Sequence, residues 1–431
     1  MNITRIYDKK RKTAAEAIES IESGMRVYIG GGAGVPQVLE NQMIARAHEL
    51  RDVEVMHVLT FSGGKYLAPE YKHAFRHRAL FMGHNARSAV AEGRADFMPV
   101  FLGEIPELFR SGALPIDIAL IQVSPPDEHG FCSFGVEVGV TKPAAQEAKL
   151  VIAEVNPRMP RVLGDSFIHL SKIDVLVDVD YELPNLPDAT IDDIQDRIGS
   201  HVADLIPDGA TLQMGIGAIP DAVLRYLGDK RDLGIHTELF SDGVIELVEN
   251  GVITNEKKNI HPGKIIAGFL FGNETLYNFV DDNAMIELHP TDYVNDPFII
   301  SKHDKMVAIN SAIEVDLTGQ VCADSIGTQF YSGIGGQVDF IRGASRSKGG
   351  KPIIAMPATA KKGQFSRIVP QLKPGAGVVT SRGDVHYVVT EYGTAYLHGK
   401  SIRERVQALI NISDPKFHDE LTAYAKKQRW L

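Results

Sequence analysis

Cysteine is scarce in this chain. Cys132 and Cys322 are the only two among 431 residues, and they do not form a CxxC pair. This low content argues against a disulfide framework and favours a reducing compartment, so we expect the protein in the cytoplasm. We predict that both cysteines are small core residues, because the sequence places no histidine partner that would make either one a nucleophile.

Long hydrophobic runs are missing too. Residues 265–271 form one of the longest, and this run is far shorter than the roughly 20 apolar residues that cross a bilayer. Five basic side chains occur from Arg5 to Lys12, but no apolar segment of a secretory signal follows them. We therefore expect neither a membrane span nor secretion.

Positive charge is in deficit, with 45 Lys and Arg against 55 Asp and Glu and a net charge of −10. That balance argues against a nucleic-acid-binding surface. Residues 342–367 depart from it, because they include basic residues and no acid. These basic residues are Arg342, Arg346, Lys348, Lys351, Lys361, Lys362 and Arg367. The stretch is either an anion-binding site or a solvated loop, and both alternatives stay open.

One local pattern occurs twice in the chain. In the first half a β-rich run, residues 25–29, leads into the glycine-rich turn 30–36. In the second half residues 210–214 lead into the turn 215–220. A helical stretch precedes each of these runs, and a second helical stretch and a short strand follow each turn. The repeat predicts an internal duplication of one fold unit.

The order of the expected elements indicates an α/β architecture. Strand-like runs alternate with helical stretches and glycine turns, as in buried and partly parallel sheets. These runs are residues 53–59, 116–123, 150–155, 175–179, 305–309, 352–356, 376–380 and 387–390. Because the chain exceeds the length that one core usually organises, we predict two related domains, residues 1–187 and 188–431. The proline-punctuated stretch 181–188 would connect them.

Glu238 distinguishes the second copy of the pattern from the first. Matching Phe61 with Phe240 places Leu59 opposite Glu238, so only one copy has an acid there. An acid at a strand end beside glycine-rich turns lies where an α/β sheet presents functional groups. The alternative is a surface or capping acid in a strand-to-loop turn. Glu391, just after the run 387–390, is its closest rival.

Other motifs narrow the choice. The turn 215–220 follows a strand and precedes a helix, so its N–H groups suit a phosphate or an oxyanion. Pro220 stands where a dinucleotide fingerprint has its third glycine, which disfavours that function. The absence of HExxH, GxSxG and P-loop patterns argues against zinc proteases, α/β-hydrolases and ATPases. We interpret the loop 124–130 as a turn capped by Asp127 and not as a catalytic loop.

These motifs, taken in order, resemble the acetyl-CoA hydrolase/transferase family, and most closely its shorter members, the 4-hydroxybutyrate and butyryl-CoA:acetate CoA-transferases. The resemblance covers nearly the whole chain. Its pieces are residues 124–127 with Gly130, then 215–220, 237–238, 332–336, 366–370 and 389–393. It implies two related CoA-transferase-type α/β domains with the active site between them, usually in a homodimer.

The resemblance also implies residue roles. Glu238 matches the glutamate that carries CoA as a thioester, and Gly336 and Glu391 match further catalytic positions. The positions matched to binding of coenzyme A are Gly215, Ile216, Gly217, Ala218, Ile219, Ile313, Gly335, Gly336 and Lys361. Coenzyme A enters as an acyl-CoA substrate, short-chain carboxylates are the other substrates, and no metal is implied.

The implied reaction explains why a glutamate is needed. A carboxylate that attacks an acyl-CoA thioester forms a mixed anhydride and releases CoA thiolate, which then attacks the glutamyl carbonyl and leaves CoA on the enzyme. Glycine-rich backbone would supply the oxyanion donors for these steps. Two alternatives stay open. One is net hydrolysis of acyl-CoA, with Glu238 or Glu391 activating water, and the other is a non-catalytic nucleotide- or metabolite-binding protein.

Overall fold

The computed structural model describes residues 3–187 and 190–431, which divide into two compact units. The first unit comprises Met1–Pro187 and Ile266–Val294, and the second comprises Asp188–Ile265 and Asn295–Leu431. Residues 266–294 thus fold with the first part of the chain. The division into domains 1–187 and 188–431 stays a prediction. Asp188, at the end of the predicted connection, lies outside the described residues.

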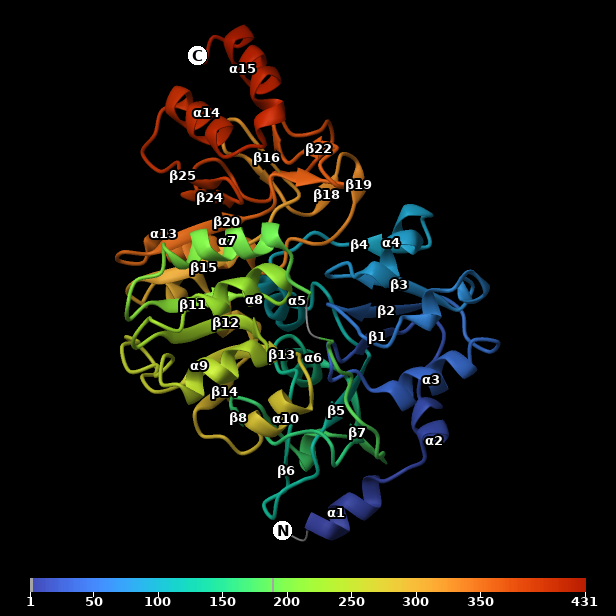
Figure 1. The fold of residues 1–431 in the computed structure, drawn as a ribbon. Coiled ribbons are helices and arrows are strands. Elements are labelled where there is room, and N and C mark those ends of the chain that lie inside the picture. The colour runs from blue at the N-terminus through green and yellow to red at the C-terminus, as the bar shows by residue number, and fades with distance from the viewer. Residues whose placement is uncertain (1–2, 188–189) are drawn as a thin grey trace. The chain divides into compact units, whose positions relative to one another are not determined.

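The first unit contains a parallel sheet with the strand order β10-β7-β5-β1-β2-β3-β4. Strands β1 to β4, blue in Figure 1, run from the middle of the sheet to one edge, and β5, β7 and β10 extend it to the other. The strands are β1 (Arg26–Ile29), β2 (Val53–His57), β3 (Phe75–Ala79), β4 (Ala95–Phe97), β5 (Ile118–Val123), β7 (Leu150–Val155) and β10 (Val175–Asp178). The order reverses between β1 and β5, which is the topological switch point of the sheet.

Helices cover both faces of this sheet because successive side chains of each strand point to opposite faces. Val27 and Ile29 of β1 belong to a core with residues of α2 and α3, whereas Tyr28 belongs to a core with residues of α5 and α6. The helices of the unit are α1 (Ile3–Lys10), α2 (Ala14–Ile18), α3 (Gln37–Ala45), α4 (His84–Ala91), α5 (Ile105–Arg110), α6 (Thr141–Glu147), α10 (Glu274–Val280) and α11 (Thr291–Val294). Its other strands are β6 (Phe131–Ser133), β8 (Leu163–Gly164), β9 (Phe167–His169), β13 (Ile265–Leu270) and β14 (Ile286–Leu288).

The second unit contains strands in the order β25-β24-β20-β15-β11-β12. The pairs whose register is described are parallel except β24 with β25, and the switch point lies between β11 and β15. These strands are β11 (Thr211–Met214), β12 (Gly234–Phe240), β15 (Met306–Asn310), β20 (Lys351–Ala355), β24 (Tyr387–Thr390) and β25 (Gly393–Tyr396). The shorter strands are β16 (Glu314–Asp316), β17 (Val321–Cys322), β18 (Ser325–Ile326), β19 (Gln329–Phe330), β21 (Thr359–Ala360), β22 (Phe365–Ser366) and β23 (Ile368–Val369).

The helices of the second unit begin at the signals that the sequence offers. Asp192 caps α7, with Gln195 completing a capping box. Asp414 accepts from the Lys416 N–H at the turn that leads into the last helix. The helices are α7 (Asp193–Ala203), α8 (Ala218–Arg225), α9 (Ile245–Glu249), α12 (Pro297–Ile300), α13 (Gln337–Arg346), α14 (Ile402–Asn411) and α15 (His418–Lys427). The predicted helical C-terminus is therefore confirmed.

Most strand predictions agree with the structure to within two residues at each end, and the parallel α/β architecture is confirmed. The strand predicted at residues 376–380 is wrong. Gly375 adopts a left-handed backbone (φ 84°), and the Gly377 N–H donates to Ser325 Oγ at 3.0 Å instead of joining a ladder. Only an isolated bridge between Val321 and Thr380 remains.

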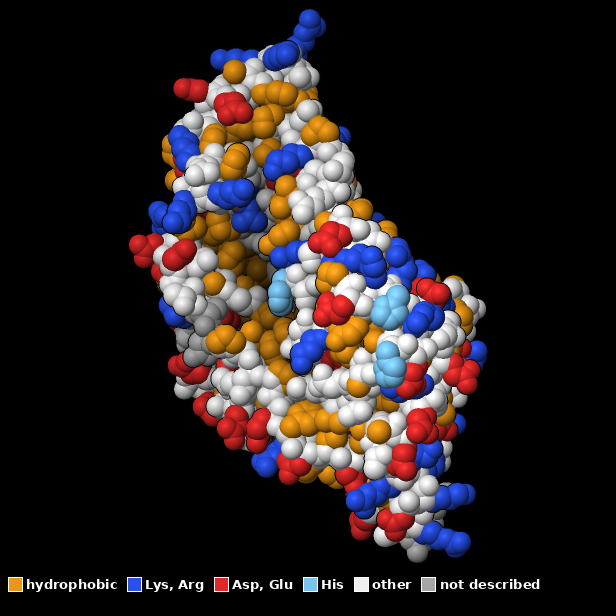
Figure 2. Space-filling model, turned by 90° about the vertical axis from the view of Figure 1, so that its right-hand side faces the viewer, with side chains coloured by type: hydrophobic (Ala, Val, Ile, Leu, Met, Phe, Trp, Pro, Cys, Tyr) orange, Lys and Arg blue, Asp and Glu red, His pale blue; other side chains and the backbone are white. Residues whose placement is uncertain are grey.

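No helix among the described residues is long and apolar enough to span a membrane. On the face drawn in Figure 2, Lys and Arg side chains lie among Asp and Glu side chains. This mixture agrees with the modest net negative charge of the chain.

Candidate active site

Glu238 lies near the carboxyl end of β12, beside β11 and hence next to the switch point of the second unit. The preceding Thr237 is buried, and its Oγ1 donates to Met214 O at 3.0 Å, which joins the ends of the two strands. The Glu238 side chain is partly exposed. Burial raises the pKa of Glu238 to about 7, and hydrogen bonds from Asn295 and the Gly336 backbone oppose that rise.

Asn295 and the start of α13 hold the Glu238 carboxylate. Asn295 Nδ2 donates to Glu238 Oε2 at 2.9 Å and to Asp339 Oδ2 at 3.4 Å. A Cβ atom at position 336 would lie 2.0 Å from Glu238 Oε2 and 2.3 Å from Asn295 Nδ2. Only glycine therefore lets the backbone at the start of α13 approach this carboxylate.

The turn 215–217 and Ile313 follow adjacent strands. Residue 215 comes directly after β11, Ile313 comes shortly after β15, and these two strands pair in parallel on either side of the switch point. Gly217 has φ 109°, which only glycine adopts readily, and it is the N-cap of α8. The fold thus gathers most of the predicted coenzyme A positions at the edge where α/β sheets bind ligands. Their roles stay predictions.

Glu391 occupies a different strand end. β24 is separated from β12 by three strands, β20, β15 and β11, so about 19 Å lies between the two strand axes. The Glu391 carboxylate accepts from the Ala358 N–H at 2.8 Å and interacts electrostatically with Arg367. Glu391 therefore does not lie beside Glu238 on this sheet. Its assignment as a catalytic residue stays a prediction.

The basic stretch 342–367 is not one loop. Arg342 and Arg346 lie on α13, and Lys351 begins β20 and donates to Leu205 O at 2.6 Å. Lys361 lies in the turn between β21 and β22, exposed, with its Nζ 5.7 Å from the centroid of the Phe365 ring. The residues therefore separate onto different elements, and Lys361 lies in an exposed turn together with Lys362.

The two cysteines and the loop 124–130 behave as expected. Both cysteines are buried, and burial raises the pKa of the Cys132 thiol to about 12, so it is not a ready thiolate. Asp127 Oδ1 accepts from the His129 and Phe131 N–H groups, each at 2.9 Å. The interpretation of this loop as a self-capped turn is confirmed.

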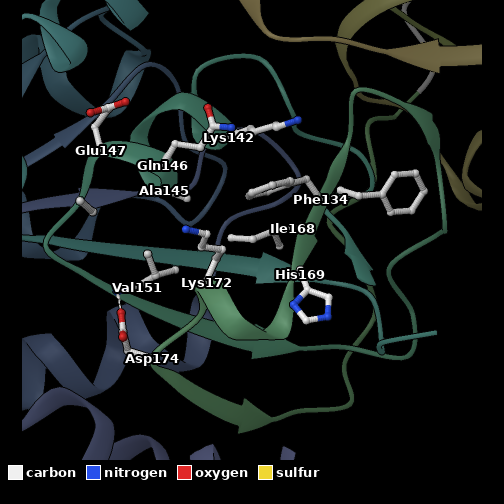
Figure 3. Close-up of a pocket in the computed structure, with 12 residues that line it drawn as sticks. Phe134, Lys142, Ala145, Gln146, Glu147, Val151, Ile168, His169, Lys172 and Asp174 are labelled. Atoms are coloured by element: carbon white, nitrogen blue, oxygen red, sulfur yellow. Dashed lines mark hydrogen bonds between the residues drawn. The ribbon is translucent and has the colours of Figure 1, made fainter. Parts of the chain in front are cut away.

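A separate cavity of about 650 Å³ lies in the first unit (Figure 3). This cavity lies at the amino ends of the strands, because its lining residue Val151 is near the start of β7 and Asp174 directly precedes β10. Two of its polar residues already bind protein groups: Asp174 Oδ2 accepts from the Val151 N–H at 2.8 Å, and Lys142 pairs with Asp165. Because open α/β sheets bind ligands at the carboxyl ends of their strands, this cavity is not the candidate site.

Among the described residues, no group of three or more His, Cys, Asp and Glu side chains is arranged to hold a metal ion. The candidate site therefore consists of Glu238, its two donors and the glycine turns. Sequence reasoning missed Asn295 and Asp339. Asn295 lies between the short helices α11 and α12, where no periodicity marks it, and Asp339 is one of several polar residues on α13.

Solved structures share this fold. RipA from Yersinia pestis is 37% identical, with a TM-score of 0.95 and coverage of 100% of both chains. The 4-hydroxybutyrate CoA-transferase of Porphyromonas gingivalis is 42% identical, with a TM-score of 0.85 and coverage of 99% of both chains. The protein is thus an α/β protein of the CoA-transferase type, as predicted. The internal duplication stays a prediction.

Sequence comparison gives the family. The acetyl-CoA hydrolase/transferase N-terminal domain matches residues 1–186, and the C-terminal domain of the same name matches residues 272–425. The 4-hydroxybutyrate coenzyme A transferase of Clostridium kluyveri is 53% identical over 428 residues, which cover 99% of this chain and 100% of that protein. The chain belongs to the acetyl-CoA hydrolase/transferase family, which confirms the resemblance.

Proposed function

We propose that the protein moves CoA between a short-chain acyl-CoA and a carboxylate through a glutamyl-CoA thioester on Glu238. Membership of the CoA-transferase class follows from the family and from the relative at 53% identity. The observation that carries the finer proposal is the Glu238 carboxylate itself, held by Asn295 at 2.9 Å at a ligand-binding sheet edge.

The environment of Glu238 suits a nucleophile. Burial raises its pKa to about 7, so the carboxylate is substantially ionised near neutral pH but is poorly solvated. Asn295 holds Oε2, and we take Oε1 as the atom that attacks the thioester carbon. This attack forms a mixed anhydride and releases CoA thiolate. The thiolate then attacks the glutamyl carbonyl, which forms the glutamyl-CoA thioester and releases the acid. An incoming carboxylate reverses these steps.

The same donors serve the covalent steps. When CoA thiolate attacks the glutamyl carbonyl, negative charge develops on an oxygen that stood in the carboxylate. Asn295 Nδ2 and the Gly336 N–H, which already bind that carboxylate, are placed to stabilise this oxyanion. Each such donor is worth about 3 kcal/mol in a site that excludes water.

Asp339 orients the Asn295 amide. Two carboxylate oxygens accept from Asn295 Nδ2, at Glu238 and at Asp339, and this arrangement turns the amide nitrogen toward Glu238. Glu391, which binds the backbone of Ala358, would act on the site only through the loop it holds. We propose that the turn 215–219, Ile313 and Gly335 contact CoA and that Lys361 meets one of its phosphates.

The relatives suggest the substrates and the setting. Because a relative named for 4-hydroxybutyrate is 53% identical, we propose 4-hydroxybutyrate, butyrate and acetate as the first acids to assay. A single missing methylene changes binding by only about 1–3 kcal/mol, so a panel of acids is needed. We further infer a cytoplasmic homodimer from the family, which light scattering after gel filtration checks for the oligomer.

Trapping the intermediate tests the mechanism. Incubation with butyryl-CoA alone, followed by borohydride, should reduce Glu238 to its alcohol, which peptide mass spectrometry detects. Glu238→Gln should abolish both trapping and CoA exchange with acetate, whereas Glu246→Gln, an exposed acid on α9, should retain both. Exchange at the normal rate in Glu238→Gln would sink the proposal. A release of free CoA that acetate does not redirect into acetyl-CoA would indicate hydrolysis instead.

A further inference from the structure

By its topology the first unit also has a position where an open α/β sheet would bind a ligand, which we call the crevice, and side chains of the unit fill it. The crevice lies at the switch point, where β1, β5 and β7 end and α3 begins. This is where an open α/β sheet binds ligands and where a helix N-terminus favours an anion. In the second unit the corresponding edge carries the candidate active site.

A buried carboxylate occupies this place. Glu154 of β7 is fully buried, and its Oε1 accepts from the Leu39 N–H, in the first turn of α3, at 2.6 Å. The residue before the helix, Pro36, offers no side-chain cap. Glu40 is the acidic residue of this first turn, but its carboxylate accepts from Ser62 Oγ, so Glu154 supplies from β7 the side-chain cap that α3 otherwise lacks.

Tyr181 closes the crevice over Glu154. Its hydroxyl donates to Glu154 Oε2 and accepts from the Gln37 N–H at 3.1 Å and from Gln122 Nε2 at 2.9 Å. Asn156 Nδ2 donates to the Tyr181 carbonyl at 2.9 Å. These polar groups satisfy one another, as buried networks must.

Tyr181 belongs to the segment that leads toward the second part of the chain. Further along this segment, Pro184 O accepts from the Tyr277 hydroxyl at 2.6 Å, and the Leu186 N–H donates to Gly272 O at 2.8 Å. The segment is thus fastened to the first unit at Tyr181, Pro184 and Leu186.

The second unit lacks this acid. If the two frames are matched at their glycine turns, Ile29 corresponds to Met214. Ile29 pairs with Leu120 in the first sheet and Met214 pairs with Ile309 in the second, so Leu120 corresponds to Ile309. The next registers match Ile152 with Ile353, which places Glu154 opposite the buried Ala355. The crevice is therefore filled by an acid in one unit and bordered by a methyl group in the other.

We propose that Glu154 is an internal ligand: its carboxyl group occupies the anion position of the first unit, and the Tyr181 hydroxyl holds it there, so that this crevice is closed to outside anions. The position takes a small carboxylate. Removing the side chain should therefore convert it into a site for free acetate, which restores the atoms lost in Glu154→Ala.

Hydrogen exchange tests the occupancy in the unaltered protein. First-turn amides of a helix have no acceptor within the helix and usually exchange fast. The Leu39 and Gln37 amides should instead exchange at least about 100-fold more slowly than the amide of Arg403, which lies at the exposed start of α14. Equal rates would show that the carboxylate does not occupy the helix terminus.

Rescue tests the ligand class. Glu154→Ala should unfold at a lower temperature than the unaltered protein, and acetate should raise its Tm by about 2 °C more than it raises that of the unaltered protein. Chloride at equal ionic strength and neutral acetamide should not reproduce this gain. An equal effect of acetate on both proteins would overturn the proposal. If Glu154→Ala does not fold, Tyr181→Phe should speed exchange at Gln37, and unchanged exchange there would overturn it instead.

Discussion

Two glutamates of this chain have similarly raised pKa values but differ in their exposure to solvent. Burial raises the pKa of both Glu154 and Glu238 to about 7, and each lies near the carboxyl end of a parallel strand. Glu154 is fully buried, and both of its oxygens accept from the first unit's own donors. Glu238 is partly exposed, and its Oε2 is the oxygen that Asn295 holds. The raised pKa is therefore common to both acids, and the exposure of the side chain is what distinguishes Glu238 from Glu154.

The two frames also place their acids on different strands. Continuing each register to the strand end matches Val58 with Glu238, while Glu154 matches Ala355. Under the predicted duplication, each unit would keep an acid where the other has an aliphatic side chain. In the first unit the acid fills the crevice from β7, and in the second it borders the turn 215–217 from β12.

The largest difference between the two acids should appear in CoA exchange. Glu238→Gln removes the proposed nucleophile and should lower the exchange rate by at least about 1,000-fold. Glu154→Gln keeps an acceptor for the Leu39 N–H and should stay within about 10-fold of normal. Steady-state exchange between butyryl-CoA and acetate measures both. If the two variants lost a comparable fraction of the exchange rate, Glu238 and Glu154 would not differ as a nucleophile and an internal ligand.

Close backbone approach should matter almost as much. In Gly336→Ala the new Cβ would come 2.0 Å from Glu238 Oε2, so the start of α13 must move away from the carboxylate. We expect a loss of about 100-fold or more in kcat, because a backbone oxyanion donor is displaced. Gly228→Ala is the matched control, since a Cβ there meets no atom within 4 Å. Full activity in Gly336→Ala would remove the Gly336 N–H from the mechanism.

The pH dependence of exchange should report Glu238 and not Glu154. Because the nucleophile must be ionised and its pKa is about 7, kcat/KM should rise with pH through about 7 and level off above it. The Asn295 hydrogen bond lowers this pKa, so Asn295→Ala should move the limb to higher pH and reduce the plateau by about 10-fold or more. Glu154→Gln should leave the limb in place. If the rising limb of kcat/KM stays at the same pH in Asn295→Ala, Asn295 does not influence the pKa of Glu238.

The sequence predicted the strands and glycine turns that frame the candidate site, and it directed attention to Glu238, whose role stays a prediction. It placed Leu59 opposite that acid, however, whereas the strand register indicates Val58. The sequence match aligned two Phe-Ser pairs, but hydrogen bonding between strands sets the register.

Contacts between residues that are far apart in the chain could not be predicted from the sequence. Asn295 meets Glu238 from 57 residues along the chain, and nothing in the sequence around Asn295 announces that contact. Glu154 is likewise a single polar residue in an apolar strand sequence. Its proposed role as an internal ligand depends on contacts with Tyr181 and with the start of α3. Such roles arise from tertiary packing and leave no local pattern.

The smallest expected effect concerns stability. Glu154 has a pKa of about 7 in the folded protein against 4.5 for an unshifted glutamate, so the folded state holds its proton more tightly. The stability linked to this proton is fully present below about pH 4.5 and is lost as the pH rises through about 7, a change of about 3 kcal/mol. Glu154→Gln cannot ionise, so its stability relative to the unaltered protein should rise by that amount between pH 4.5 and 8. Urea unfolding across this range measures it, with Glu246→Gln as the flat control. A flat difference for Glu154→Gln would contradict this prediction, because it would mean that the Leu39 and Tyr181 donors offset the cost of burying the charge.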